Sequence, residues 1–318
     1  MRPPSLPRIA VATILPALLL APLAARENPS ASADKGRKKT RPFAWVSPAN
    51  DRATGNLPTG VRHATFKSPS MGVEVGYYLY LPPGYNDPAN ADRRYAVVYH
   101  LHGGRPGGEY KSVRLAALVH TAIEAGEIEP TIYVFPNGGP MSWYNMPDRE
   151  QAMGESVFVT ELLPHIDATW RTTGQRSGRA LEGFSQGGRG TTRIMFKHPE
   201  LFASVAPGGS GYEPETRIQE NDGWESENLR LLPLGYNAWD LAAKYAENPK
   251  PELRILLWVG TEGFNYQFNL KFSRYLDELG IPHKMLVVEG VDHSAIRIYE
   301  KKGLELMQFH QQNFARGK

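Results

Sequence analysis

A serine between glycines is the clearest candidate for chemistry in this chain. The segment Gly183-Phe184-Ser185-Gln186-Gly187 follows a short apolar run, 180–184, and precedes a stretch of helical spacing, 190–197. A G-x-S-x-G segment between a strand and a helix is the nucleophile elbow, a strained turn that exposes the serine hydroxyl. Glycines on either side leave room for the neighbouring strand and helix. We therefore expect Ser185 to attack a carbonyl carbon in acyl transfer.

A serine hydroxyl is a poor nucleophile until a base accepts its proton. In proteins with this elbow the histidine comes last along the chain. His293 has this position, because it follows the last predicted strand, 284–288, by a short loop. Its imidazole is suited to accept and return a proton near neutral pH. His310 is a competitor, but it lies within a helical pattern.

The third member of such a triad is an acid that orients the histidine and stabilises its charged form. This acid should follow the predicted strand 254–259, which leads into Gly260-Thr261-Glu262-Gly263. We expect Glu262 to fill the role. Asp292 is a rival, although adjacent residues rarely reach the needed geometry, and Asp222 and Asp240 are more distant alternatives.

Acyl transfer also needs hydrogen-bond donors for the oxyanion that develops on the carbonyl oxygen. One donor should be the backbone N–H of Gln186, directly after the serine. The other should come from His102-Gly103-Gly104, which follows the continuous apolar run 95–101. Because glycine lets the backbone approach a substrate closely, we assign the N–H of Gly104, with Arg105 next in order. The alternative is that this segment is a simple β-turn.

Two aromatic residues lie in the loop 137–145, which follows the predicted strand 131–135. In open α/β sheets, ligands bind at the carboxyl ends of the strands. We therefore expect Trp143 and Tyr144 to flank an acyl or sugar group of the substrate. The alternative is that both residues only pack the loop.

These separate loops need a scaffold that brings them together. From about Val61, short β-rich runs alternate with helical stretches, which predicts an α/β fold with a mainly parallel sheet and helices on both faces. The closely spaced runs 62–67 and 74–81 predict an antiparallel pair at the sheet edge. The stretch 208–251 has no predicted strand, and we expect this insertion to lie beside the active site rather than to be a packed surface excursion. The predicted helices are 112–125, with Ser112 as N-cap, then 155–170, 190–197, 239–246, 269–279 and 304–314.

The N-terminal residues have the layout of a secretory signal peptide. Arg2 and Arg8 supply positive charge, the run 9–23 is apolar, and small residues follow at 24–25. We expect residues 1–25 to be this signal, and the alternative is an uncleaved anchor. The apolar run is short for a membrane span, so the mature form should have none.

The remaining chain divides into two parts. Residues 26–60 are polar and carry a basic run at 35–41, which is typical of a flexible segment. Residues 61–318 are long enough for one catalytic domain. A secreted or periplasmic location follows from the signal, and the absence of cysteine means that no disulfide stabilises the fold.

Charge and composition exclude some functions. The net charge is +3, and two of these units come from Arg2 and Arg8. A protein so close to neutrality has no electrostatic basis for binding nucleic acid. With 41% hydrophobic and 22% charged residues, the chain is typical of a globular protein.

Three motifs together resemble a known family. The sequence resembles the "Putative esterase" family, which includes esterase D (S-formylglutathione hydrolase), feruloyl esterases, enterochelin esterase-like proteins and the antigen 85 mycolyltransferases. The resemblance runs from about Val61 to Phe314. The motifs that carry it are Leu81-Pro82-Pro83-Gly84-Tyr85, Tyr99-His100-Leu101-His102-Gly103-Gly104 and Gly183-Phe184-Ser185-Gln186-Gly187-Gly188.

The resemblance implies an α/β-hydrolase fold, a Ser–His–acid triad, and neither a cofactor nor a metal. It maps the nucleophile onto Ser185, the base onto His293 and the oxyanion donors onto Gly104 and Gln186. One position departs from the pattern, because relatives often carry the acid as Asp where this chain has Gly263. Either Glu262 acts from one position earlier or the triad is incomplete.

The implied function is a serine carboxylic ester hydrolase. A secreted location favours small-molecule or polysaccharide-linked esters, such as feruloyl, acetyl or siderophore esters. Three alternatives stay open: acyl transfer to an acceptor other than water, cleavage of peptide amides, and non-catalytic binding on a hydrolase scaffold because of Gly263.

Overall fold

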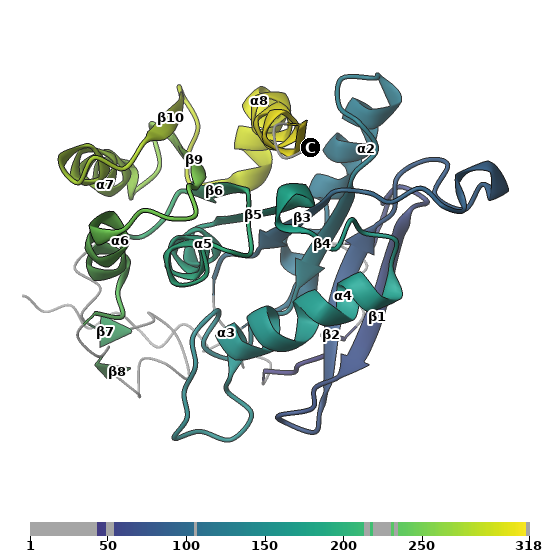
Figure 1. Ribbon diagram of the computed structural model, residues 1–318, viewed down its shortest axis with the longest axis horizontal. Coiled ribbons are helices and arrows are strands. Elements are labelled where there is room, and N and C mark those ends of the chain that lie inside the picture. Colours follow the sequence, from purple (N-terminus) through teal and green to yellow (C-terminus); the bar gives the residue numbers. More distant parts are fainter. Residues whose placement is uncertain are drawn as a thin grey trace, which may run out of the picture. The chain divides into compact units, whose positions relative to one another are not determined.

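A single sheet of eight strands, β1-β2-β4-β3-β5-β6-β9-β10 in order, forms the centre of the protein. The computed structural model describes residues 43–48, 54–104, 107–212, 217–218, 230–231 and 235–315. Pairing is antiparallel at the β1–β2 edge and between β2 and β4, and parallel from β4 to β10. This confirms the predicted α/β architecture with an antiparallel edge (Figure 1).

The strands agree closely with the apolar runs of the sequence. Those at the centre are buried along their whole length, as expected where helices cover both faces of a sheet. The strands are β1 Val61–Lys67, β2 Glu74–Tyr80, β3 Val97–Leu101, β4 Ile132–Pro136, β5 Arg179–Phe184, β6 Ser204–Gly208, β9 Arg254–Gly260 and β10 His283–Val288.

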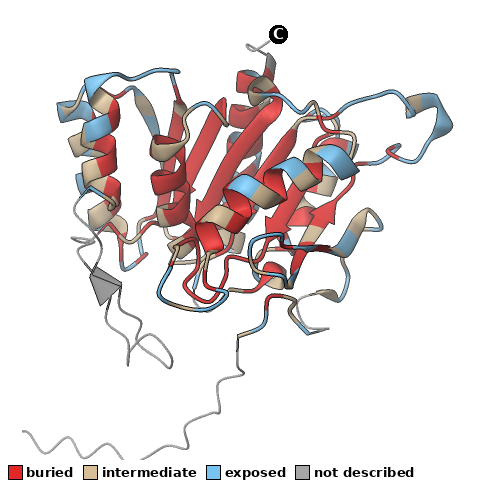
Figure 2. Cartoon of the chain, turned by 60° about the horizontal axis from the view of Figure 1, so that its bottom comes forward, coloured by how far each residue is buried: buried red, intermediate tan, exposed pale blue. Residues whose placement is uncertain are grey.

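Helices cover both faces of the sheet. Helices α2 and α8 pack on one face of the sheet, and the other helices pack on the opposite face. Each face of the sheet has its own buried apolar cluster. Figure 2 shows that the strands at the centre of the sheet are buried. The helices are α2 Leu115–Glu124, α3 Gly154–Ser156, α4 Leu163–Thr169, α5 Gln186–Lys197, α6 Ala238–Glu247, α7 Tyr266–Glu278 and α8 Ala295–Ala315, with a π-helical segment, Val157–Leu162, between α3 and α4.

Two local expectations need correction. Helix α2 begins at Leu115 after Arg114, and no side chain caps its N-terminus, so Ser112 is not the N-cap. The insertion 208–251 contains a short antiparallel pair, β7 (Arg217–Ile218) and β8 (Arg230–Leu231), where no strand was predicted. Two residues per strand leave no periodicity that a sequence pattern could reveal. Helix α6 of this insertion packs on the apolar cluster that α5 also covers.

The folded domain begins earlier than residue 61. Residues 43–48 belong to the expected flexible segment, yet Trp45 is buried and its indole Nε1 donates a hydrogen bond to the carbonyl oxygen of Gln151 at 2.9 Å. The carbonyl oxygen of Trp45 accepts from the N–H of Gly76 at 2.7 Å, and Ser47 Oγ donates to Glu109 at 2.6 Å. These hydrogen bonds to Gln151, Gly76 and Glu109 join the segment to the domain.

The expected signal peptide, 1–25, lies outside the described residues. None of the helices within the described ranges combines the length and the apolar character needed to cross a bilayer. Residues from Arg41 to the C-terminus form one compact unit.

Candidate active site

Ser185 lies at a sharp turn between β5 and α5. Its backbone has φ 60° and ψ −115°, a conformation that non-glycine residues rarely adopt. The N–H of Ser185 donates to the carbonyl oxygen of Gly208 at 2.8 Å, which ties the turn to β6. A side chain on Gly187 would collide with the carbonyl group of Leu101 at the end of β3. The glycine is therefore required for the close approach of α5 to the sheet.

The structure brings Ser185 and His293 together across 108 residues of sequence. Nε2 of His293 lies 2.9 Å from Oγ of Ser185. His293 is in the loop between β10 and α8, and Ser185 follows β5. Both strands belong to the parallel part of the sheet, so their carboxyl ends meet at one edge. This geometry lets the imidazole accept the hydroxyl proton directly.

The imidazole of His293 lies between solvent and the core. The ring of Phe184 has its centroid 4.7 Å from that of the imidazole. Burial lowers the pKa of His293 to about 4, and the negative charge of Asp292 opposes this shift only in part. The neutral form, which acts as a base, therefore predominates over the whole range above that pKa.

The low pKa of His293 predicts an unusual pH profile. Because the neutral imidazole must accept the serine proton, activity should be lost only as the pH falls through about 4, well below the ordinary histidine value of 6.5. We expect the acidic limb of kcat/KM for an ester substrate to have its midpoint there, measured from about pH 3 to about pH 8. A midpoint near the ordinary value would contradict the burial argument.

The expected acid partner of His293 is not in place. In the described part of the chain, Nδ1 of His293 is buried and has no hydrogen-bond partner. Glu262 is exposed, and the loop directs only its backbone inward, where its N–H donates to the carbonyl oxygen of Val291 at 3.0 Å. The assignment of Glu262 as the orienting acid is therefore corrected. Its side chain points to solvent because residue 263, not 262, faces the histidine loop.

The rival acids are engaged elsewhere. Asp292 is half exposed and forms an ion pair with Arg297 at 2.8 Å. Asp240 accepts hydrogen bonds from Asn237 and from the N–H of Gly235 at the start of α6. Asp222 lies outside the described residues. Within the described ranges, the site therefore contains a serine and a histidine without a carboxylate on Nδ1.

Gly263 lies beside the backbone of the loop that carries the histidine. It is buried, and a Cβ atom built on it would lie 3.8 Å from the backbone nitrogen of His293 and 3.6 Å from Oδ1 of Asn265. Oδ1 of Asn265 is itself a buried acceptor without a partner in the described ranges. A side chain at residue 263 would thus project toward the backbone of the loop that carries His293.

The placement of Glu262 gives a direct test. Replacing it with glutamine should change kcat/KM for ester hydrolysis by no more than about 3-fold, because the exposed carboxylate makes no contact with the imidazole. The measurement is steady-state kinetics on an acetate ester. A loss of about 100-fold or more would return Glu262 to the catalytic group.

A buried histidine organises the loop after β3. Nε2 of His102 accepts hydrogen bonds from the N–H groups of Gly108 and Gly138, at 3.1 and 3.0 Å. Its Nδ1 donates to the carbonyl oxygen of Gly103 at 3.1 Å, so both ring nitrogens are used by a neutral imidazole. Burial lowers the pKa of His102 well below its ordinary value, which keeps it neutral. The His-Gly-Gly motif by itself does not reveal this role of His102.

The two proposed oxyanion donors come from elements beside Ser185. Gln186 is the first residue of α5, where backbone N–H groups are at the positive end of the helix. Gly104 has φ +71° and is exposed, and its neighbour Arg105 lies outside the described residues. The N–H of Gly104 shares a peptide plane with the carbonyl of Gly103, so it points away from the His102 ring. A Cβ on Gly103 would lie 2.9 Å from that of Ser185, so the loop passes against the nucleophile.

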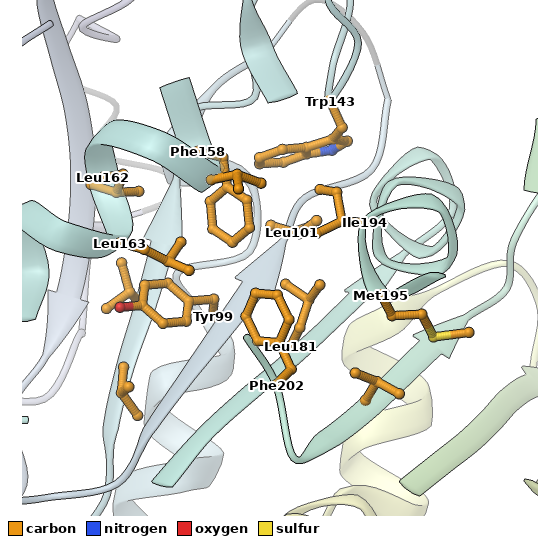
Figure 3. Packing of buried hydrophobic residues seen from close by; sticks show 14 of the residues in the cluster. Tyr99, Leu101, Trp143, Phe158, Leu162, Leu163, Leu181, Ile194, Met195 and Phe202 are labelled. Atoms are coloured by element: carbon orange, nitrogen blue, oxygen red, sulfur yellow. The ribbon is translucent and has the colours of Figure 1, made fainter. Parts of the chain in front are cut away.

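Trp143 and Tyr144 do not line the site. Trp143 is fully buried, and its indole Nε1 donates to the carbonyl oxygen of His102 at 3.1 Å. Figure 3 shows its ring among apolar side chains that include Phe158 and Leu101. Tyr144 is also buried, with the guanidinium of Arg193 at 3.7 Å from its ring centroid. The expected substrate contact is corrected, because both rings pack the loop from beneath.

Among the residues that the structure describes, there is no set of three or more histidine, aspartate or glutamate side chains that could hold a metal ion.

Known proteins resemble this chain in family and in fold. The family model described as "Putative esterase" matches residues 68–277. Esterase Rv1288 of Mycobacterium tuberculosis is 29% identical over 256 residues, which are 71% of this chain and 54% of that protein. The chain thus spans about half the length of this curated relative.

Solved structures share the fold. A ferulic acid esterase superposes with a TM-score of 0.64 at 22% identity, over 80% of this chain and 98% of the other. FphF of Staphylococcus aureus, a fluorophosphonate-binding serine hydrolase, superposes with a TM-score of 0.67 at 19% identity, over 79% of this chain and 97% of the other. These similarities confirm the α/β-hydrolase fold.

Proposed function

Because the chain belongs to the "Putative esterase" family, whose model matches two thirds of its length, we propose that it is a serine hydrolase of carboxylic esters. The single observation that carries this proposal is the hydrogen bond of 2.9 Å between the strained Ser185 and His293. A strained residue in contact with a base at the carboxyl edge of a parallel sheet is costly to maintain and has no structural purpose of its own.

In the first half of the proposed reaction, Ser185 becomes acylated. Its Oγ bonds to the ester carbonyl carbon while Nε2 of His293 takes the hydroxyl proton. The carbonyl oxygen carries the negative charge and accepts hydrogen bonds from the N–H groups of Gln186 and Gly104. The bond from carbon to the alcohol oxygen then breaks, and His293 returns the proton to that oxygen.

In the second half, water restores the enzyme. His293 takes a proton from water, whose oxygen bonds to the acyl carbon. The bond to Ser185 Oγ breaks, Oγ receives the proton, and the carboxylic acid leaves. With no carboxylate on Nδ1 in the described ranges, the imidazolium that forms in each half is stabilised less than in a complete triad. We therefore expect a slower hydrolase than one with all three members.

The substrate class is part of the proposal. A signal-like N-terminus favours an exported enzyme that meets feruloyl or acetyl esters of polysaccharides, or other small esters. The similarity of fold to a ferulic acid esterase supports including an aromatic acid among the acyl groups tested.

A panel of substrates tests the proposal. Purified protein is incubated with p-nitrophenyl acetate, p-nitrophenyl butyrate, methyl ferulate and a peptide amide, and a fluorophosphonate probe is applied to the folded protein. We expect ester hydrolysis, little or no amide hydrolysis, and labelling of Ser185. No ester cleavage and no labelling would favour a binding protein, and faster product formation with an added alcohol would favour acyl transfer.

A further inference from the structure

One aromatic residue beside the candidate site is exposed where apolar residues are normally buried. Phe264 lies in the loop between β9 and α7 and exposes 79% of its surface, about twice as much as any other large apolar residue in the described ranges. Its ring centroid is 4.1 Å from that of the His293 imidazole. The most exposed large apolar side chain of the described residues therefore contacts the proposed base.

The loop that carries Phe264 is well anchored. The N–H of Glu262 and that of Gly263 donate to the carbonyl oxygens of Val291 and Gly260, at 3.0 and 3.1 Å. Asn265, the next residue, is buried, and its side chain donates to the carbonyl oxygen of Gly209. The exposed ring thus projects from backbone that is fixed on both sides, so its position next to His293 is built into the fold.

The contact between Phe264 and His293 indicates which part of a substrate the Phe264 ring can contact. In the proposed reaction the alcohol oxygen must come within hydrogen-bond distance of Nε2 to receive its proton. The group attached to that oxygen then passes beside the imidazole and the ring packed on it. The carbonyl oxygen of the ester is instead bound, in the proposed reaction, by the N–H groups of Gln186 and Gly104.

We propose that Phe264 is a specificity residue that binds the alcohol part of the ester by packing against an apolar ring face. An exposed phenyl ring gains by covering a flat partner, either an aryl group or the C–H face of a sugar. This inference rests on the proposed function and extends it to the leaving group.

Three acetate esters test the role of Phe264, because they form the same acetyl-enzyme and differ only in the alcohol. These are benzyl acetate, an acetylated methyl glycoside and ethyl acetate. Replacing Phe264 with alanine should lower kcat/KM about 10-fold for the ester whose ring it binds, mainly through KM, and change ethyl acetate by less than about 3-fold. Phe264→Tyr, which keeps the ring, should retain the preference.

The outcomes separate this inference from the proposed function. A selective loss for benzyl acetate alone identifies an aryl site, and one for the glycoside alone identifies a sugar site. If the ratios of kcat/KM among the three esters stay the same, whether or not all three values fall, the inference is overturned and the hydrolase assignment is left intact. If the unaltered protein cleaves none of the esters, the proposed function fails first. The acidic limb of the pH profile of kcat/KM for ethyl acetate, measured in each variant, reports whether the ring acts only by shielding His293 from solvent.

Discussion

Replacing Ser185 with alanine should reduce ester hydrolysis to the background rate, a loss of about 10⁴- to 10⁶-fold in kcat/KM. No acyl-enzyme can form without the hydroxyl that lies 2.9 Å from Nε2 of His293. Alanine keeps the Cβ atom that the turn already accommodates at φ 60°, and the side chain of Ser185 does not cap α5, so the turn should persist. The measurement combines steady-state kinetics on p-nitrophenyl acetate with fluorophosphonate labelling, and both signals should disappear.

A second serine–histidine pair provides the matched control. Ser273 Oγ on α7 lies 2.7 Å from Nε2 of His283, a hydrogen bond as short as that of Ser185 but away from the elbow. Ser273→Ala should therefore keep both activity and labelling, provided that its thermal unfolding stays cooperative. Hydrolysis that survives in Ser185→Ala but not in Ser273→Ala would refute the assignment of the nucleophile.

Replacing Gly263 with aspartate should increase activity, by between about 10- and about 1000-fold in kcat/KM. A carboxylate there would face the loop of His293, whose Nδ1 is buried without a partner in the described ranges. It would accept the Nδ1 hydrogen and stabilise the imidazolium that forms during both halves of the reaction. Because a nearby negative charge favours the protonated imidazole, the pKa of His293 should rise and the acidic limb should move to higher pH.

Two variants separate the charge from its side effects. The Cβ atom of any new side chain at residue 263 would lie 3.1 Å from the carbonyl oxygen of Gly260, a tight contact that all replacements share. Gly263→Ala has this contact alone, and Gly263→Asn adds a polar acceptor without charge. We expect activity in the order Asp, Asn, Ala. An aspartate variant no better than alanine, with its acidic limb unmoved, would show that the carboxylate does not reach the imidazole.

The sequence alone determined the strands of the central sheet and the order of the serine and the histidine along the chain. Apolar runs bounded by glycine and proline predict the strands, because a strand buried on both faces needs a continuous apolar segment. The elbow at Ser185 could also be predicted, since only glycine fits beside the turn. Parallel strands place their carboxyl ends at one edge, so the pairing of Ser185 with His293 was implied by topology before any distance was known.

Only the tertiary structure decided which way the loop side chains face. Trp143 and Phe264 are both aromatic residues in loops after strands, yet one is fully buried and the other is 79% exposed. Glu262 faces solvent while Gly263 faces the histidine loop. Loops lack the periodicity that reports a buried face in a helix or strand, so orientation there depends on contacts with residues distant in sequence.

The same reason explains the burial of Trp45, which lies within residues 26–60, a stretch whose overall polar composition predicts a flexible segment. Its hydrogen-bond partners include Gln151 and Gly76, far along the chain. His102 also gains its role only when the loops after β3 and β4 lie side by side and present their N–H groups to one ring. Composition and spacing describe what a segment can do by itself, whereas hydrogen-bond partners and burial are set by the segments that the fold brings next to it.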